Sequence, residues 1–161
     1  MIIKHPLPLS GFDYIGQHYY GLTWCCDYRK PLFTQSDRVD LVLQQFLRAC
    51  AETKFELIAY NFMQDHAHKL VRGMSDDSDG RRYIKLAKQY SGYYFSQEFG
   101  EKLWQRYGVD QWLQDDLAAR RFASYTIENP VKAGLVERVE DYPYTGSSVM
   151  SLKQLIEWSR G

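Results

Sequence analysis

The sequence predicts a single α+β domain built on an antiparallel sheet, and two observations carry this prediction. Strand-like and helix-like segments follow one another in the order strand, helix, strand, strand, helix, strand, with one more helix after them. The composition is that of a folded protein, since 45% of the 161 residues are hydrophobic and 25% are charged. A chain of this length buries most of its apolar surface as one domain, and no repeat or long linker divides it.

The first strand and the first helix have the clearest patterns in the N-terminal part. Residues 17–27 (QHYYGLTWCCD) are rich in aromatic and β-favouring side chains and predict a strand. Apolar residues then recur at three- and four-residue steps across 39–50, which predicts one apolar face of a helix. Ser36 or Asp37 is expected to cap that helix.

Two further strands follow, joined by a two-residue connection. Residues 55–63 (FELIAYNFM) are almost continuously apolar, as expected of a strand buried on both faces. Residues 66–72 (HAHKLVR) predict the next strand, in which successive side chains alternate between the two faces. His66 and His68 are therefore expected to point the same way.

The later elements are a helix over about 81–99, an interrupted strand within 102–113 and a helix that Asp115 or Asp116 caps and that reaches Asn129. Pro130 is expected to end the last of these helices, because proline disfavours helical geometry in the residue before it.

This order of elements is that of the ferredoxin-like split βαβ fold, in which helices cover one face of the antiparallel sheet and leave the other face free. An additional helix before Pro130 and a short helical tail at about 149–161 complete the expected architecture. The prediction is one domain over 1–161 with a core at about 14–148.

Cysteine usage and hydropathy bear on location. The three cysteines are an odd number without Cys-x-x-Cys spacing, which argues against a zinc ribbon and a disulfide framework and favours buried small hydrophobes. The sequence has neither the pattern of a signal peptide nor an apolar run of membrane length. We therefore expect a cytoplasmic protein without a membrane partner.

Charge and aromatic content point in different directions for nucleic-acid binding. The formal net charge is zero, whereas phosphate contacts normally require an excess of Lys and Arg, so any basic surface must be segregated. Aromatic residues make up 16% of the chain, and exposed rings can stack unpaired bases, although most rings of a globular protein fill its core. Tyr93, Trp104 and Trp112 are the candidate stacking rings.

Two pairs of residues could carry chemistry. The His66-x-His68 pair offers two neutral nitrogen ligands to a divalent cation from one face of a strand, or the two imidazoles are simply polar strand residues. Tyr125 and Asn129 are four residues apart and share one face of a helix. That helix, packed on the histidine-bearing face, would add a phenol and an amide to the site; otherwise Tyr125 is a core aromatic and Asn129 a helix stop.

Taken together, these segments resemble a known family. The string 61–71 (NFMQDHAHKLV) is similar to the His-hydrophobic-His strand of single-tyrosine HUH transposases, especially the REP-associated tyrosine transposases. A second block matches their C-terminal signature in order and spacing: LWQR at 103–106, the run from Arg120 through YTIENPVKAGLV at 125–136, and DYPY at 141–144.

The resemblance implies a single-strand DNA endonuclease and strand transferase that cuts beside a hairpin through a covalent 5′-phosphotyrosine. It implies that Tyr125 is the nucleophile and that His66, His68 and Asn129 hold Mg²⁺ or Mn²⁺. The implied partner is single-stranded DNA that folds into a REP-like palindromic hairpin, bound by a monomer or a homodimer.

The chain departs from the family pattern in two ways: Gln64-Asp65 stands where Pro-Asn is usual, and the net charge is neutral rather than basic. Two other functions stay open, and the neutral charge favours the second of them. One is a domesticated or non-catalytic single-stranded nucleic-acid-binding module, and the other is a small metal-dependent phosphoesterase that uses water as nucleophile.

Basic side chains that could contact DNA phosphates occur in three segments, with a solvated helix face as the alternative for each. They are Arg72, Arg81, Arg82, Lys85, Lys88, Arg120 and Arg121.

Overall fold

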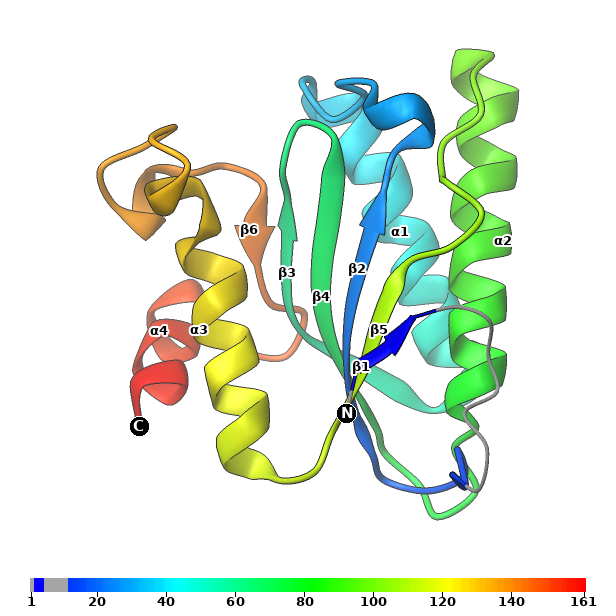
Figure 1. Ribbon diagram of the computed structural model, residues 1–161, viewed down its shortest axis with the longest axis vertical. Helices are drawn as coiled ribbons and strands as arrows, with labels where there is room; N and C mark the ends of the chain where they lie inside the picture. Colours follow the sequence, from blue (N-terminus) through cyan, green and yellow to red (C-terminus); the bar gives the residue numbers. More distant parts are fainter. Residues whose placement is uncertain (1, 5–11) are drawn as a thin grey trace.

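The computed structural model describes residues 2–4 and 12–161, and a six-stranded antiparallel sheet forms its centre (Figure 1). The strand order is β1-β5-β2-β4-β3-β6. The strands are β1 (Ile2–Lys4), β2 (Tyr19–Cys25), β3 (Phe55–Phe62), β4 (His66–Gly73), β5 (Val109–Leu113) and β6 (Thr145–Gly146). The helices are α1 (Ser36–Thr53), α2 (Gly80–Phe99), α3 (Asp116–Lys132) and α4 (Leu152–Arg160).

Helices lie on both faces of the sheet. α1 and α2 cover one face, where Trp24, Phe46 and Val71 belong to the larger hydrophobic cluster. α3 packs on the other face through Phe122 and Ile127, with α4 against its outer side. The predicted α+β fold with an additional helix is thus confirmed, but the expectation of a free second face holds only for the part that α3 leaves uncovered.

The four long strands and the four helices lie where periodicity predicted them, whereas two helix boundaries differ. Gln35 is the N-cap of α1 and makes no side-chain cap bond, so Ser36 and Asp37 begin the helix instead of capping it. Asp115 caps α3 as predicted, its carboxylate accepting from the Ala118 amide. Pro130, however, does not end α3 but lies inside its last turn. The proline costs the helix one backbone hydrogen bond there, and burial of its side chain offsets this cost.

A lysine lies in the core on the α1/α2 side of the sheet. Lys69 follows His68 on β4 and therefore faces away from it; its side chain is 1% exposed. The Nζ atom lies 3.7 Å from the ring centroid of Trp24 and 3.4 Å from that of Phe46, without a hydrogen-bond partner among the described residues. Aromatic ring faces attract an ammonium, whereas desolvation by burial holds the pKa of Lys69 well below its usual value.

The three cysteines differ in exposure. Cys26 and Cys50 are buried, and desolvation raises the pKa of Cys26 to about 12 and that of Cys50 to about 11. Cys25 is partly exposed and lies opposite His66 in the β2–β4 ladder, on the face of the sheet that α3 covers in part. Within the described chain, none of the helices has the length and apolar character that a membrane span requires.

Cys25 is therefore expected to be alkylated first. Thiolates are the reactive species, so iodoacetamide at about pH 8 should modify Cys25 at least ten times faster than Cys26 or Cys50 in the folded protein. Peptide fragmentation by mass spectrometry assigns the modified position, and labelling in urea, where all three should react, is the control. Equal rates at Cys25 and Cys50 in the folded state would contradict the described burial.

Candidate active site

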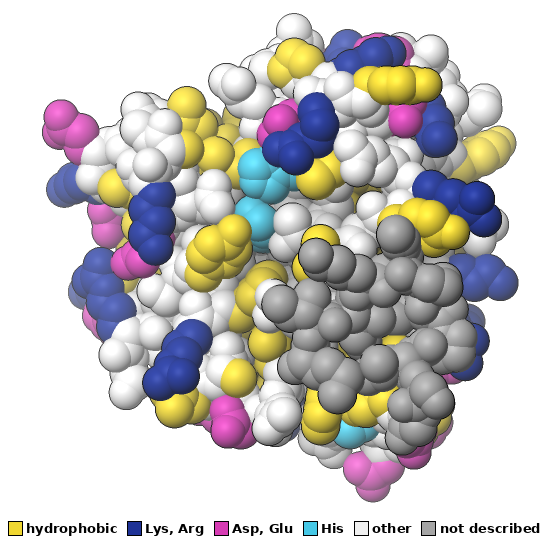
Figure 2. Space-filling model, in the orientation of Figure 1, with side chains coloured by type: hydrophobic (Ala, Val, Ile, Leu, Met, Phe, Trp, Pro, Cys, Tyr) yellow, Lys and Arg dark blue, Asp and Glu magenta, His cyan; other side chains and the backbone are white. Residues whose placement is uncertain are grey.

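The two histidines of β4 point to the same face of the sheet, toward α3, as strand alternation predicted. Their ring centroids are 4.8 Å apart. The side chain of His66 is 18% exposed, whereas His68 is 2% exposed. Figure 2 shows histidine side chains at the surface in the middle of the molecule, and Lys and Arg on this face are scattered among Asp and Glu.

Asp65 orients the outer histidine. Its Oδ1 lies 2.7 Å from Nδ1 of His66, and its Oδ2 is paired with Arg29 at 3.0 Å. A carboxylate accepts hydrogen bonds, so it favours the tautomer of His66 that carries a proton on Nδ1. The Nε2 lone pair of His66 is then available to a ligand.

Thr23 orients the inner histidine. It lies directly opposite His68 in the β2–β4 ladder, and its Oγ1 is 2.8 Å from Nδ1 of His68. Desolvation, assisted by the neighbouring His66, lowers the pKa of His68 to about 3. His68 is therefore a neutral imidazole at physiological pH, and Nε2 can offer a lone pair when Nδ1 donates to Thr23.

α3 brings the other two predicted residues to the histidines. The Tyr125 ring centroid is 5.2 Å from that of His68, and the Asn129 amide Nδ2 is 3.4 Å from Nε2 of His68. Tyr125 is 46% exposed, so its side chain is accessible from solvent. The phenol, the amide and both imidazoles thus lie together within one chain.

A glycine permits the close approach of α3 to the sheet. A Cβ atom at Gly21 of β2 would lie 2.6 Å from the Phe122 ring, which is too close for any real side chain. Phe122 therefore lies directly over the backbone of β2. Tyr125, less than one turn further along α3, is held above the same strands.

The donor set fits an open, catalytic type of metal site. Two imidazole nitrogens and the Asn129 side-chain amide, whose oxygen and nitrogen can exchange places by a flip, give at most three ligands. In the described part of the chain no group of three or more His, Cys, Asp and Glu could hold a metal ion. Amide oxygen suits Mg²⁺ and Mn²⁺, whereas imidazole nitrogen is the more usual ligand of ions such as Zn²⁺ or Ni²⁺; the remaining coordination positions would be open to phosphate oxygens.

The predicted basic residues do not form one patch. Arg121 is exposed beside Tyr125, and Arg72 lies on the histidine-bearing side of β4 with its guanidinium 5.2 Å from the Tyr19 ring. Arg120 instead donates to Asp116 at 2.6 Å and to the Trp158 carbonyl at 3.0 Å.

The remaining basic residues belong to α2, on the far side of the sheet. Arg82 donates to the Glu52 carbonyl and Lys88 to that of Arg106, while Arg81 and Lys85 are exposed. The role of all seven residues in DNA binding stays a prediction.

Of the candidate stacking rings, Trp104 is excluded because it is 5% exposed and donates from Nε1 to Ser91. Tyr93 is 56% exposed on α2, and Trp112 is partly buried. Sequence patterns did not indicate Thr23 or Asp65 as supporting residues, since their roles depend on strand register and on the turn between β3 and β4.

Comparison with known proteins gives concordant matches. The family described as "Transposase IS200 like" matches residues 14–126, a range that contains His66, His68 and Tyr125. A Haemophilus influenzae protein provisionally assigned as a REP-associated tyrosine transposase is 28% identical over 121 residues, which cover 68% of this chain and 69% of the relative.

Two solved structures are similar in fold. A REP-associated tyrosine transposase bound to a REP hairpin superposes with a TM-score of 0.70 and 20% identity, covering 86% of this chain and 82% of that one. A protein of Deinococcus radiodurans, provisionally assigned as a transposase, gives a TM-score of 0.53 at 20% identity and covers 76% and 97%.

Proposed function

This chain belongs to the IS200-like transposase family, and from that premise we propose that it cuts and rejoins single-stranded DNA beside a hairpin through a covalent phosphotyrosine. The observation that carries the proposal is an accessible phenol, that of Tyr125, whose ring centroid is 5.2 Å from His68 of the imidazole pair. The similar transposase bound to a REP hairpin supports a REP-like palindrome as the substrate. Because phenol and imidazoles lie in one chain, the proposal includes catalysis within a monomer.

In the proposed reaction the Tyr125 oxygen attacks the scissile phosphorus. A bond forms between the phenolic oxygen and phosphorus, the bond to the 3′-oxygen breaks, and the phenolic proton is passed through solvent to the departing 3′-oxygen. The products are a 5′-phosphotyrosine and a free 3′-hydroxyl. The ester bond is conserved, so a second 3′-hydroxyl can reverse the step and rejoin the strand.

His66, His68 and Asn129 would hold the divalent cation that this reaction requires. When bound, Mg²⁺ or Mn²⁺ supplies neutralising charge to the non-bridging oxygens of the phosphate. The protein's own contribution is orientation: Asp65 and Thr23 each engage an Nδ1 atom, which leaves the Nε2 atoms of both imidazoles available as ligands.

A pool of DNA hairpins with randomised single-stranded flanks tests the proposal. The protein is incubated with the pool with and without Mn²⁺, the bound species are recovered, and labelled samples are run on a denaturing gel. We expect a covalent protein–DNA band that requires Mn²⁺. Cleavage without that band would instead indicate hydrolysis by water.

The second candidate is a DNA-binding module that has lost catalysis, and one observation favours it: the described residues contain no group of three or more His, Cys, Asp and Glu that could hold a metal ion. This function predicts retention of hairpins on a native gel with no covalent band under any metal condition. Native and denaturing gels run on the same samples therefore separate the two candidates.

The carboxylate of Asp65 is expected to strengthen metal binding. Asp65→Ala removes the hydrogen-bond acceptor of His66 Nδ1 and should weaken Mn²⁺ affinity by about 10- to 100-fold, whereas Asp65→Asn, which keeps an acceptor oxygen, should lose less. Titration of free Mn²⁺ followed by electron paramagnetic resonance measures this directly. Asp77→Ala, which removes an exposed carboxylate paired with Lys54, is the matched control, and an equal loss there would refute a specific role for Asp65.

A further inference from the structure

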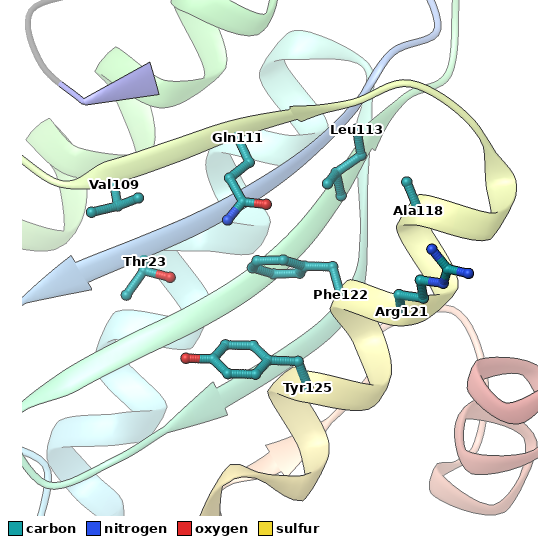
Figure 3. Close-up of a pocket in the computed structure, with 8 residues that line it drawn as sticks. All are labelled: Thr23, Val109, Gln111, Leu113, Ala118, Arg121, Phe122 and Tyr125. Atoms are coloured by element: carbon teal, nitrogen blue, oxygen red, sulfur yellow. The ribbon is translucent and has the colours of Figure 1, made fainter. Parts of the chain in front are cut away.

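A pocket of about 540 Å³ opens directly beside Tyr125, between α3 and strands β2 and β5. Figure 3 shows Phe122 and Tyr125 extending from α3 toward the strands, with Gln111 projecting from β5 and Thr23 from β2. The tyrosine proposed to attack the DNA therefore lines this pocket together with residues of β2, β5 and α3.

The walls are mainly apolar and include a flat aromatic surface. Val109 and Leu113 line one side, and the Phe122 ring, 7% exposed, lines the other. Such a surface suits a planar heterocycle, because base–aromatic stacking depends on ring area rather than on base identity. A phosphate or sugar alone would leave these apolar side chains without a partner.

Gln111 is the polar group in this pocket that remains available for recognition. Thr23 is already engaged with His68, and Arg121 lies exposed at the other end of the pocket, on α3. The half-buried Gln111 amide has no hydrogen-bond partner among the described residues. An amide presents one donor and one acceptor side by side, which matches the edge of a nucleobase.

Chain connectivity places a base within reach. A phosphorus atom attacked by Tyr125 must lie at its hydroxyl, and each base that flanks that phosphate is only one sugar away. We propose that this pocket binds one unpaired nucleobase next to the scissile phosphate and that Gln111 is the residue that discriminates among bases there. The proposal rests on the proposed cleavage of single-stranded DNA and adds the substrate feature that the site reads.

An abasic scan tests the pocket by binding alone. The hairpin recovered from the randomised pool is made with an abasic nucleotide at each flank position in turn, and its affinity for the Tyr125→Phe protein, which cannot cut, is measured by fluorescence anisotropy. One position is expected to lose about 5- to 100-fold in affinity. The position of the wild-type covalent adduct, mapped separately, should be adjacent to it.

Gln111→Leu then tests discrimination at that position. With the four natural bases installed in turn, the parent protein should prefer one base by about fivefold or more, and Gln111→Leu should bind all four within about twofold of one another. Gln89→Leu is the control, because Gln89 is an exposed residue of α2 on the opposite side of the sheet, and this variant should keep the base preference. Retained preference in Gln111→Leu would overturn the role of Gln111.

The possible failures are distinguishable. Hairpin binding that no abasic position weakens, or a sensitive position remote from the adduct, would overturn the base pocket and leave the cleavage proposal intact. Failure to recover any hairpin from the pool would overturn the proposed function, and the pocket proposal with it.

Discussion

Tyr125→Phe is expected to abolish the covalent protein–DNA adduct, lowering its rate of formation by at least about 10³-fold. The substitution removes only the oxygen that would bond to phosphorus and keeps the ring that lies 5.2 Å from His68. Because the side chain is 46% exposed, loss of its hydroxyl should leave folding unchanged. Hairpin affinity on a native gel should change less than about threefold, so that binding and chemistry separate.

Tyr93→Phe is the matched control, since it removes an exposed tyrosine hydroxyl on the opposite side of the sheet. It should form the adduct at the parental rate. An adduct that persists in Tyr125→Phe would mean that another side chain is the nucleophile. Unchanged DNA cleavage in Tyr125→Phe without any adduct would indicate a water-using phosphoesterase.

Lys69→Met is expected to stabilise the protein by about 1–3 kcal/mol, the cost that burial without a hydrogen bond imposes on a polar group. The amine is 1% exposed, and desolvation lowers its pKa. Methionine has a similar shape and would keep the contacts with Trp24 and Phe46 without an amine to desolvate. Urea unfolding at constant pH measures the change, which should appear as a higher midpoint with an unchanged slope.

Lys85→Met, at an exposed position of α2, is the corresponding control and should shift stability by less than about 0.5 kcal/mol. A destabilised Lys69→Met protein would show that the ammonium is retained in the core and that its contacts with the rings outweigh desolvation. Since Lys69 faces away from His68, Mn²⁺ affinity should be unaffected by the substitution.

The sequence was sufficient to predict most of the fold, because its long elements have strong periodicity. Two short strands escaped prediction, since the three residues of β1 and the two of β6 are too few to establish alternation. The prediction that Pro130 ends the helix was wrong, because burial in the last turn of α3 overrides the local preference of proline against helix. The sequence analysis predicted a free second face of the sheet, and it anticipated that α3 covers part of this face only by considering a late helix packed on the histidine-bearing side.

The site was predictable where it depended on local geometry and on resemblance. Alternation along β4 fixed the common direction of His66 and His68, and helical spacing placed Tyr125 above Asn129. The partners of the imidazoles were not predictable, because Thr23 reaches His68 only through the register of β2 against β4. Gln111 was missed for the same reason, since β5 pairs with β2 although β2 ends at Cys25 and β5 begins only at Val109.

The missing side chain at Gly21 has a consequence for how sequences of this fold can vary. It sets the height of α3 above the strands, because the Phe122 ring occupies the space that a methyl group would need. That height determines both how far the phenol reaches and how deep the neighbouring pocket is. An alanine at position 21 would therefore be tolerated only together with a smaller residue at 122, so these two positions are expected to change as a pair in active relatives.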